Sequence, residues 1–395
     1  MLIPPFSVAR LPRIEFGVGS FRKVPALLAG FGKHVLLVTG SRSFRETPHW
    51  SWLTTELEVQ GFAWQEFAVS GEPSPQLVDQ AVGDLRGLGI DVVLGIGGGS
   101  VLDAAKAIAG LLKPGNSVLD HLEGVGPELP YLGPATPFIA VPTTAGTGSE
   151  ATRNAVLSVH GKDGYKKSFR DERLVPEYAV VDPDLLAGCP RPLIAANGMD
   201  ALTQLLESWV SSRANPFTDA LALSGLEAAR DGLLAWYGGG PEAAAGREKM
   251  AWAALLSGIT LAQVGLGSVH GLASPLGAFF PIPHGVVCGT LVAAATGANI
   301  RAMQEREPGN PALARYAQVG RLLAGRDMAD DEARAALVQI LAEWTTRLEL
   351  PALGAYGIAA TDFAHIVAHC RGSSMKTNPI VLSDAEVTAI LAERV

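Results

Sequence analysis

The sequence contains few cysteines, and no two of them lie close together in the chain, as they would in a CxxC motif. Cys189, Cys288 and Cys370 are the only three in 395 residues, and no CxxC spacing occurs. An odd number of isolated thiols excludes a disulfide framework and is typical of a reducing compartment. The first twenty residues carry two early prolines and charges, so they do not predict a signal peptide. We therefore expect a cytoplasmic protein.

The sequence also lacks long basic runs and long apolar runs. It has no run of lysine and arginine longer than the pair Lys166-Lys167, and its formal net charge is −8 at pH 7. A protein that coats nucleic acid or an anionic membrane needs a denser positive surface. Glycine, proline or polar residues break every apolar window before it reaches the ~18 residues of a membrane span. We therefore expect neither a nucleic-acid partner nor a membrane protein.

The sequence does contain enough apolar material for a large folded protein. Its residues are 48% hydrophobic and 18% charged, a combination that excludes intrinsic disorder. At roughly 100–200 residues per domain, the length predicts two domains or one large one. A chain of this length buries roughly three quarters of its surface, so it needs neither a disulfide nor a metal merely to fold.

The first half of the chain alternates short apolar runs with stretches of helical periodicity. We predict buried strands at residues 34–39, 91–96, 137–141 and 178–182, and helices at residues 75–88 and 100–112. Residues 13–17 are expected to add an edge strand or a hairpin. Strands that alternate with helices predict a mostly parallel sheet with helices on both faces.

The second half is rich in alanine and leucine and has few β-branched runs. We predict helices at residues 195–211, 215–236, 245–266, 311–323 and 330–347. Prolines between residues 183 and 192 mark the boundary between the half with alternating strands and helices and the half with helices alone. The expected fold class is therefore an α/β domain over residues 1–185 followed by an all-α domain over residues 186–395.

Three glycines follow the predicted strand at residues 91–96 and lead into a helix. Gly97, Gly98 and Gly99, followed by Ser100, let backbone N–H groups approach an anion, and the helix start adds its positive end. The carboxyl end of a parallel strand is where open α/β sheets bind ligands. The spacing is not GxGxxG, so an ordinary Rossmann dinucleotide site is not indicated. A glycine-rich turn without a ligand is the alternative.

A second polar loop, residues 142–150, follows the strand at residues 137–141. It combines four hydroxyl side chains with two glycines, which can surround a phosphate or a ribose. Serine and threonine clusters also form plain turns, so the loop alone does not decide between the two interpretations.

The helical half holds residues of the types found in metal sites. Asp200 and Gln204 lie four residues apart, which places both on one helix face. His270 and His284 lie fourteen residues apart in a region rich in glycine and proline. Imidazoles and a carboxylate suit Fe(II) or Zn(II) and leave a position open for a substrate oxygen.

Two alternatives to this metal site stay open. The first is that both histidines are ordinary core residues. The second is the rival pair His365 and His369, one helical turn apart, with Asp362 as the nearby carboxylate. Cys288, four residues after His284, is expected to be buried rather than catalytic.

Taken together, these motifs resemble the iron-containing (group III) alcohol dehydrogenase family. The most specific segments are GGGSVLDAAK at residues 97–106, PTTAGTGSE at residues 142–150 and PHG at residues 283–285. The resemblance covers essentially the whole chain. It implies a Rossmann-like N-terminal domain, a helical C-terminal domain as in dehydroquinate synthase-like proteins, and an active site between them.

The resemblance also implies which residues bind a nicotinamide cofactor and a metal. Family members bind NAD(P) with the glycine turn and the hydroxyl-rich loop, and a family lysine near the cofactor matches Lys166. The family's metal is held by one aspartate and three histidines, and three of these positions match here. The implied cofactor-binding residues are Gly97, Gly98, Gly99, Ser100, Asp103, Thr143, Thr144, Thr147, Ser149 and Lys166, and the implied metal ligands are Asp200, His270 and His284.

Two positions depart from the family pattern. Gln204 stands where the family usually has its second metal ligand, a histidine. An amide oxygen can bind a metal, but more weakly than imidazole. Ser274 stands where many members carry a histidine that helps to relay protons. We expect Gln204 to be the fourth metal ligand, and His270 and Ser274 to act in catalysis, with Ser274 relaying a proton through water.

The residues after the strand at 34–39 bear on the choice between NAD and NADP. NAD-preferring family members often carry an acidic residue there, which binds the ribose hydroxyls. This chain has Gly40, Ser41 and Arg42 instead, with no carboxylate to repel a 2′-phosphate and an arginine to attract one. NADP(H) is therefore favoured over NAD(H); the alternative is that Arg42 merely faces solvent.

The resemblance implies a metal-dependent NAD(P)(H)-linked oxidoreductase that interconverts an alcohol with an aldehyde or a ketone. It further implies a small-molecule substrate and a homodimer or a multiple of dimers. Three alternatives stay open: a maleylacetate-reductase-like enzyme, a dehydroquinate-synthase-like lyase, and a metal-free NADP-binding relative that has lost catalysis.

Overall fold

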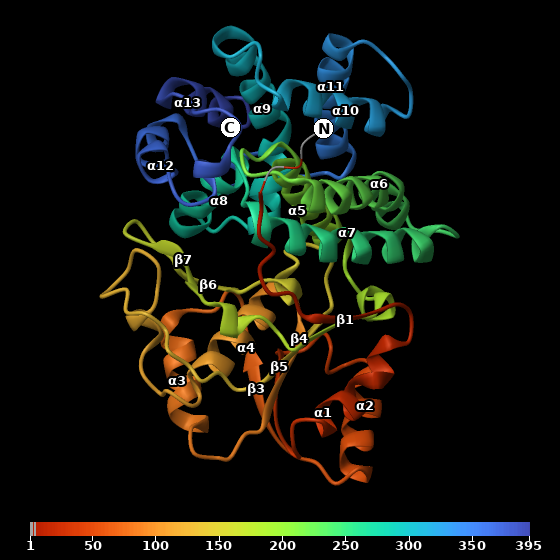
Figure 1. Cartoon of the computed structure of the whole chain (residues 1–395), viewed down its shortest axis with the longest axis vertical. Helices are drawn as coiled ribbons and strands as arrows, with labels where there is room; N and C mark the ends of the chain where they lie inside the picture. The colour runs from red at the N-terminus through yellow and green to blue at the C-terminus, as the bar shows by residue number, and fades with distance from the viewer. Residues whose placement is uncertain (1–2, 4) are drawn as a thin grey trace. The chain divides into compact units, whose positions relative to one another are not determined.

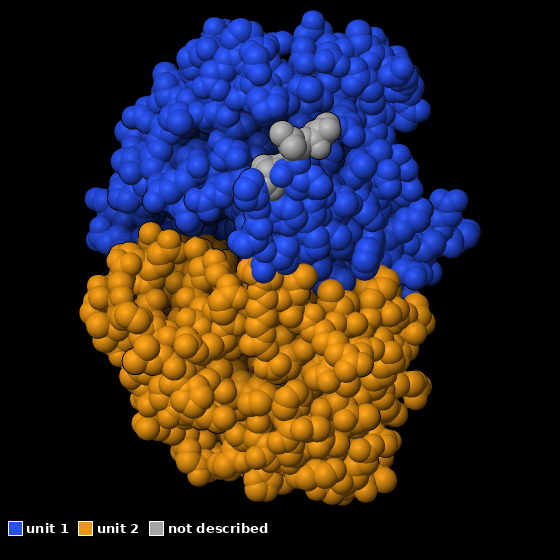
Figure 2. Space-filling view, viewed as in Figure 1, with its two compact units in different colours: residues 1–8, 160–165, 190–395 blue, residues 9–159, 166–189 orange. Residues whose placement is uncertain are grey.

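The computed structural model describes residue 3 and residues 5–395, which divide into two compact units (Figure 2). Unit 2 comprises residues 9–159 and 166–189. Unit 1 comprises residues 160–165 and 190–395, together with the described residues before Ala9. The sequence-based boundary after residue 185 lies close to Pro190, but nothing in the sequence indicated that two short upstream segments group with unit 1.

Unit 2 is built on a six-stranded sheet in which every adjacent pair of strands is parallel, in the order β1-β8-β5-β4-β2-β3. The predicted parallel sheet and the predicted edge strand are thus confirmed. The one strand of this sheet that the sequence analysis did not predict is β3, in which most residues are exposed and Val69 alone is buried. The strands are β1 Arg13–Phe16, β2 His34–Gly40, β3 Ala63–Val69, β4 Val92–Gly97, β5 Phe138–Pro142 and β8 Tyr178–Val181.

Helices cover both faces of this sheet, as Figure 1 shows. Alternate strand residues such as Val35 and Leu37 pack into one apolar cluster with residues of α1 and α2. On the other face, Gly95 leaves no room for a side chain, because an added Cβ would lie 2.9 Å from Ala105 of α4. The helices of this unit are α1 Val24–Ala29, α2 Pro48–Val59, α3 Pro75–Leu85 and α4 Gly99–Leu111, and a separate two-stranded sheet is formed by β6 Asn154–Val159 and β7 Tyr165–Arg170.

Unit 1 is helical and is arranged around α5, which is buried along nearly its whole length from Ile194 to Val210. Helices α6, α7 and α9 all contact it, and α8 packs against α9. The five predicted helices are confirmed as α5, α6, α7, α10 and α11. The helices are α5 Arg191–Val210, α6 Pro216–Gly238, α7 Ala243–Val264, α8 Ser268–Phe279, α9 His284–Arg306, α10 Ala312–Ala324, α11 Asp330–Arg347, α12 Phe363–His369 and α13 Asp384–Ala392.

Helices α8 and α9 were not predicted, because their sequences are rich in residues that disfavour helices. Pro275 lies inside α8. In α9, an added Cβ on Gly285 would lie 2.6 Å from the Ala196 carbonyl oxygen, and one on Gly289 would lie 2.8 Å from Met199 Cβ. These glycines therefore allow α9 to approach α5 closely, and packing outweighs their low helix propensity.

Among the described residues, α9 is the one single helix that is long and apolar enough to cross a membrane. Its apolar window is 94% buried inside the protein, as in a core helix. The pair α7 and α8 passes the same test only if joined across a bend of 100°.

Candidate functional site

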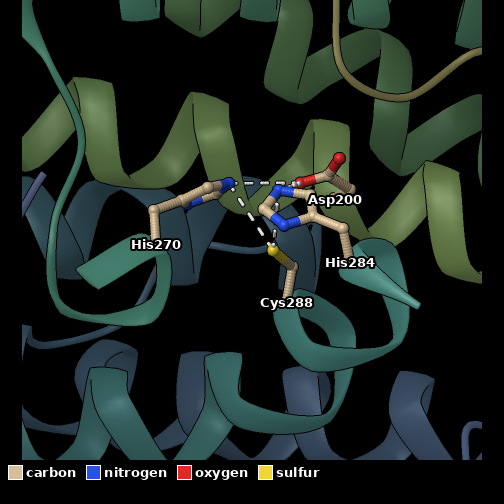
Figure 3. Close-up of side chains that lie close together, drawn as sticks. All are labelled: Asp200, His270, His284 and Cys288. Atoms are coloured by element: carbon tan, nitrogen blue, oxygen red, sulfur yellow. Dashed lines mark hydrogen bonds and ion pairs between the residues drawn. The ribbon is translucent and has the colours of Figure 1, made fainter. Parts of the chain in front are cut away.

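Three helices of unit 1 bring four metal-binding side chains together (Figure 3). Asp200 lies on α5, His270 in the first turn of α8, and His284 and Cys288 in the first two turns of α9. One ligand atom from each of the four lies within 4.8 Å of all the others. Figure 3 shows the carboxylate, the two imidazoles and the thiol lying close together.

The distances within this cluster are those of directly neighbouring polar atoms. His270 Nε2 lies 3.2 Å from Asp200 Oδ1, and His284 Nε2 lies 3.8 Å from the same oxygen. Cys288 Sγ lies 3.5 Å from His270 Nε2 and 3.8 Å from His284 Nε2. Asp200 and Cys288 are buried, whereas the His284 side chain is 26% exposed. The cluster is therefore accessible to solvent at His284.

The carboxylate and the imidazoles of the cluster shift each other's pKa values toward the charged forms. Burial acts to raise the pKa of Asp200, but the imidazoles of His284 and His270 outweigh it and lower that pKa to about 2. Burial acts to lower the pKa of His270, but its partners Cys288, Asp200 and Glu207 raise that pKa well above the usual value. Burial raises the pKa of the Cys288 thiol to about 12. The carboxylate is thus ionised at neutral pH.

Glu207 fixes the orientation of His270, a role that the sequence analysis missed. Its Oε2 accepts a hydrogen bond from His270 Nδ1 at 2.7 Å, and its Oε1 accepts one from the Val269 N–H at 2.7 Å. In the neutral imidazole this contact keeps the proton on Nδ1 and directs the Nε2 lone pair at the cluster, as a metal ligand requires. The sequence could have indicated this role of Glu207, because the residue follows Asp200 by seven positions, two helical turns along the same face of α5.

The residues present fit a divalent cation. Asp200 Oδ2 is buried, and no described residue donates a hydrogen bond to it. A buried carboxylate oxygen without a donor is costly unless a cation or water occupies the space before it. Two imidazoles and a carboxylate are also the donors that Fe(II) and Zn(II) accept.

The other predicted residues of this half lie near the cluster or outside it. Gln204 is buried on α5 one turn after Asp200, and its Oε1 accepts a hydrogen bond from Ser257 Oγ of α7 at 3.0 Å. Ser274 is half-buried on α8 one turn after His270. The rival histidines, His365 and His369, are exposed, pack at tilted angles against each other, and are not part of this cluster. The roles of Gln204 and Ser274 stay predictions.

In unit 2 the glycine turn and the hydroxyl-rich loop lie against each other. A Cβ added to Gly98 would lie 3.3 Å from Thr144 Oγ1, and one added to Gly99 would lie 2.7 Å from Thr147 Oγ1. Both segments follow adjacent strands, because Ile96 of β4 pairs with Val141 of β5. The N-terminus of α4, at Gly99, therefore opens beside a row of hydroxyl groups. That arrangement suits an anion such as a pyrophosphate.

A buried lysine holds the second loop in place. Lys106 Nζ, on α4, donates to the carbonyl oxygens of Ser149 and Asn154 and to the hydroxyls of Ser149 and Thr152, at 2.6–3.0 Å. Ser149 Oγ donates in turn to Asp103 Oδ1 at 2.5 Å. Burial lowers the pKa of Lys106 to about 8. Asp103 and Ser149, both predicted cofactor residues, are thus parts of a network that shapes the loop.

The two remaining predicted cofactor sites also lie in unit 2. Lys166 is mostly buried, with Nζ 2.5 Å from Glu72 Oε1. Gly40 ends β2, which neighbours β4 in the sheet, so the segment that follows it lies at the same sheet edge as the glycine turn. The Arg42 side chain is 81% exposed and pairs with Glu46 at 3.3 Å.

Comparison with known proteins places both units in one enzyme family. Residues 12–183 match the family described as iron-containing alcohol dehydrogenase. Residues 194–395 match its C-terminal counterpart, described as Fe-containing alcohol dehydrogenase family, C-terminal.

Individual relatives agree with this assignment. The chain is 34% identical to the probable alcohol dehydrogenase EutG of Escherichia coli (strain K12), over 86% of this chain and 82% of that protein. It is 30% identical to the NADPH-dependent butanol dehydrogenase of Clostridium saccharobutylicum, over 90% of this chain and 88% of that protein. A solved structure of 1,3-propanediol oxidoreductase superposes with a TM-score of 0.87 at 27% identity, over 99% of this chain and 100% of that one.

Proposed function

Because the chain belongs to the iron-containing alcohol dehydrogenase family, we propose that it reduces an aldehyde or a ketone to the alcohol, reversibly, with NADPH and a divalent cation. It is an oxidoreductase of the class that interconverts alcohols and carbonyl compounds with NAD(P)(H). One hydride and one proton convert the carbonyl to the alcohol and leave NADP⁺. The observation that carries the proposal is the convergence of Asp200, His270 and His284.

In this proposal the cluster of unit 1 holds the cation and the substrate oxygen. A bound divalent cation supplies Lewis-acid polarisation of that oxygen, and NADPH supplies the hydride. Asp200, His270 and His284 offer the ligand atoms, and Glu207 keeps His270 in the required tautomer. Ser274, one turn after His270, passes a proton through water, since a hydroxyl does not act as a base near neutral pH.

Unit 2 binds the cofactor in this proposal. Gly97, Gly98, Gly99 and Ser100 present the backbone N–H groups and helix start that suit the pyrophosphate. The hydroxyls of Thr143, Thr144 and Thr147 lie on the loop beside this turn. Arg42 attracts the 2′-phosphate of NADPH. Its exposed ion pair with Glu46 is worth only about 0.2–1 kcal/mol, so the guanidinium can leave Glu46 for the phosphate at little cost. That one relative is named an NADPH-dependent enzyme supports the same choice.

We further propose a cytoplasmic location and a homodimeric assembly. The free thiols of Cys189, Cys288 and Cys370 suit a reducing compartment. The dimer rests on the family resemblance alone, and the molar mass of the purified protein in solution tests it.

Metal analysis of the purified protein, combined with turnover, tests the proposal. NADPH oxidation is measured against a panel of aldehydes and ketones before chelation, after chelation, and after Fe(II) or Zn(II) is restored. We expect turnover that is lost on chelation and returns with the cation. Tight NADPH binding without turnover by the cation-loaded protein would contradict the proposal and favour a relative that has lost catalysis.

A further inference from the structure

The fourth side chain of the cluster is a cysteine, not the residue predicted from the sequence. Cys288 lies one helical turn after His284 on α9, so both side chains leave the same helix face. The residue is fully buried, yet its sulfur faces two imidazole nitrogens at 3.5 and 3.8 Å rather than apolar groups alone. A cysteine that served only as a small apolar core residue would not need these polar neighbours.

The spacing of the four donors matches a tetrahedral site. Zinc binds nitrogen and oxygen at about 2.0–2.2 Å and sulfur at about 2.3 Å, which requires donor–donor distances of about 3.3–3.7 Å at tetrahedral angles. Four of the six donor–donor separations are 3.2, 3.5, 3.8 and 3.8 Å, and the other two are no longer than 4.8 Å. The donor–donor distances therefore need to change by no more than about 1 Å for the four side chains to surround one ion.

Gln204, by contrast, already uses its ligating atom. Its Oε1 accepts the hydrogen bond from Ser257 Oγ, in a site where both residues are buried. Turning the amide oxygen toward a cation would break this contact, after which Ser257 Oγ would keep the Ala254 carbonyl oxygen, at 2.8 Å, as its acceptor. The cluster thus includes the thiol of Cys288 on α9, whereas Gln204, at the position of the family histidine on α5, is hydrogen-bonded to Ser257.

We propose that Cys288 is the fourth protein ligand of the cation, so that the chain holds it with one carboxylate, two imidazoles and one thiolate. The thiol proton passes to solvent as the cation binds. A thiolate is a soft donor, and soft donors select Zn(II) over Fe(II). We therefore assign Zn(II) as the preferred ion. This inference rests on the proposed function only in requiring a cation at this cluster.

Cobalt substitution tests the ligand directly, because Co(II) bound by a thiolate gives a charge-transfer band in the near ultraviolet. Co(II) bound only by nitrogen and oxygen gives weak visible bands alone. The protein is stripped with a chelator and titrated with Co(II). We expect one Co(II) per chain with the charge-transfer band. Stoichiometric cobalt with visible bands but no charge-transfer band would overturn the assignment of Cys288, whereas turnover with the restored cation would still support the proposed function.

Two sets of variants identify the thiol. In the double variant Cys189→Ser/Cys370→Ser, Cys288 is the one remaining cysteine, so the band must persist without any change at the cluster. In Cys288→Ser the band must disappear while cobalt still binds. Cys370→Ser is the matched control, since it removes a buried thiol whose hydrogen bond to the Val367 carbonyl oxygen a serine can keep. A band that is lost in the double variant would overturn the proposal.

Ion preference gives a second readout that does not depend on activity. The stripped protein is equilibrated with Zn(II) and Fe(II) together without oxygen, and both metals are counted. We expect the preference for Zn(II) over Fe(II) to fall about tenfold or more in Cys288→Ser and to stay unchanged in Cys370→Ser. An unchanged preference in Cys288→Ser would count against the thiolate ligand. If no variant or wild-type protein binds any cation and none turns over, the proposed function fails together with this assignment.

Discussion

At the scale of single residues, the cluster depends on a side chain that does not belong to it. Glu207 accepts hydrogen bonds from both His270 and the backbone of Val269. It therefore sets the tautomer of the imidazole as well as the start of α8. Residues in this position commonly change metal affinity by about 10–100-fold when they are replaced.

We expect Glu207→Gln to weaken cation binding by about 10–100-fold, because an amide can offer its nitrogen to His270 and so favour the wrong tautomer. Competition against a coloured chelator measures the dissociation constant. Glu248→Gln, an exposed acid on α7, is the control and should leave it unchanged. Turnover of Glu207→Gln should recover at high cation concentration. Equal affinity in both variants would remove Glu207 from this role.

Replacing Arg42 tests whether this residue binds the 2′-phosphate of NADPH. Arg42→Ala should raise the KM for NADPH about tenfold or more, because a charged hydrogen bond to a phosphate is worth about 1.5–3 kcal/mol. The KM for NADH should stay unchanged, since NADH has no 2′-phosphate. Steady-state kinetics with both cofactors measures the ratio. A parallel rise for both would show that Arg42 acts on the fold of the loop instead.

Glu150 provides a pH dependence with a defined sign. Burial raises the pKa of this carboxyl to about 7, above the value of about 4.3 in an unfolded chain. Between these two pH values the folded state binds one proton more than the unfolded state. The contribution of Glu150 to the unfolding free energy is therefore largest below about pH 4.3 and falls as pH rises toward 7. The difference in unfolding free energy between wild type and Glu150→Gln should therefore change by up to about 1.4 kcal/mol per pH unit over this window. Urea unfolding at several pH values measures it, and a difference independent of pH would contradict it.

At the scale of elements, the close contact between the α4 N-terminus and the neighbouring loop leaves no space for a side chain. In Gly99→Ala the new methyl group would lie 2.7 Å from Thr147 Oγ1 and push the loop away from the helix start. We expect NADPH affinity to fall at least tenfold, with cation binding to unit 1 unchanged. Fluorescence titration with NADPH measures the first, and metal counting the second. Gly83→Ala on α3, where the added methyl group meets nothing within 4 Å, is the matched control.

The elements also show what the sequence could and could not predict. Strands β2, β4, β5 and β8 were predictable because their residues form continuous buried apolar runs. Strand β3 lies at a sheet edge, where only part of its residues are buried, so its pattern is weak. Helix α9 was missed because Gly285 and Gly289 lower its intrinsic propensity, although they are what lets it pack on α5.

In the candidate site, too, some residues could be predicted from the sequence and one could not. Spacing on one helix and the two histidines indicated Asp200, His270 and His284, which the structure brings together. Cys288 was expected to be buried, and it is, but its neighbours depend on how α8 and α9 pack. Local sequence carries no information about that packing, so the contact between Cys288 and His270, which lies on another helix, could not be predicted.

At the scale of the whole molecule, the order of the strands in the sheet has a consequence for how the protein is made. β1 leaves the ribosome first, yet the strand that pairs with it, β8, is among the last of unit 2 to be synthesised. At about 5–20 residues per second, roughly 8–30 s pass between the two. Throughout that time the nascent chain carries a strand without its neighbour, which invites pairing with other chains.

Charge on the unpaired strand protects it during this interval. Arg13 and Glu15 alternate with Ile14 and Phe16 along β1, and charged residues on an edge discourage pairing with another chain. Arg13→Val should therefore lower the soluble yield in growing cells. The unfolding free energy of the purified protein should fall by no more than about 1 kcal/mol, the value of an exposed cation–π contact such as that between Arg13 and the Tyr178 ring. Equal soluble yields of the wild type and Arg13→Val would show that the charge of Arg13 does not prevent β1 from pairing with other chains. Arg13, which contacts the Tyr178 ring in the folded protein, would thus also keep β1 from pairing with other chains before β8 has been synthesised.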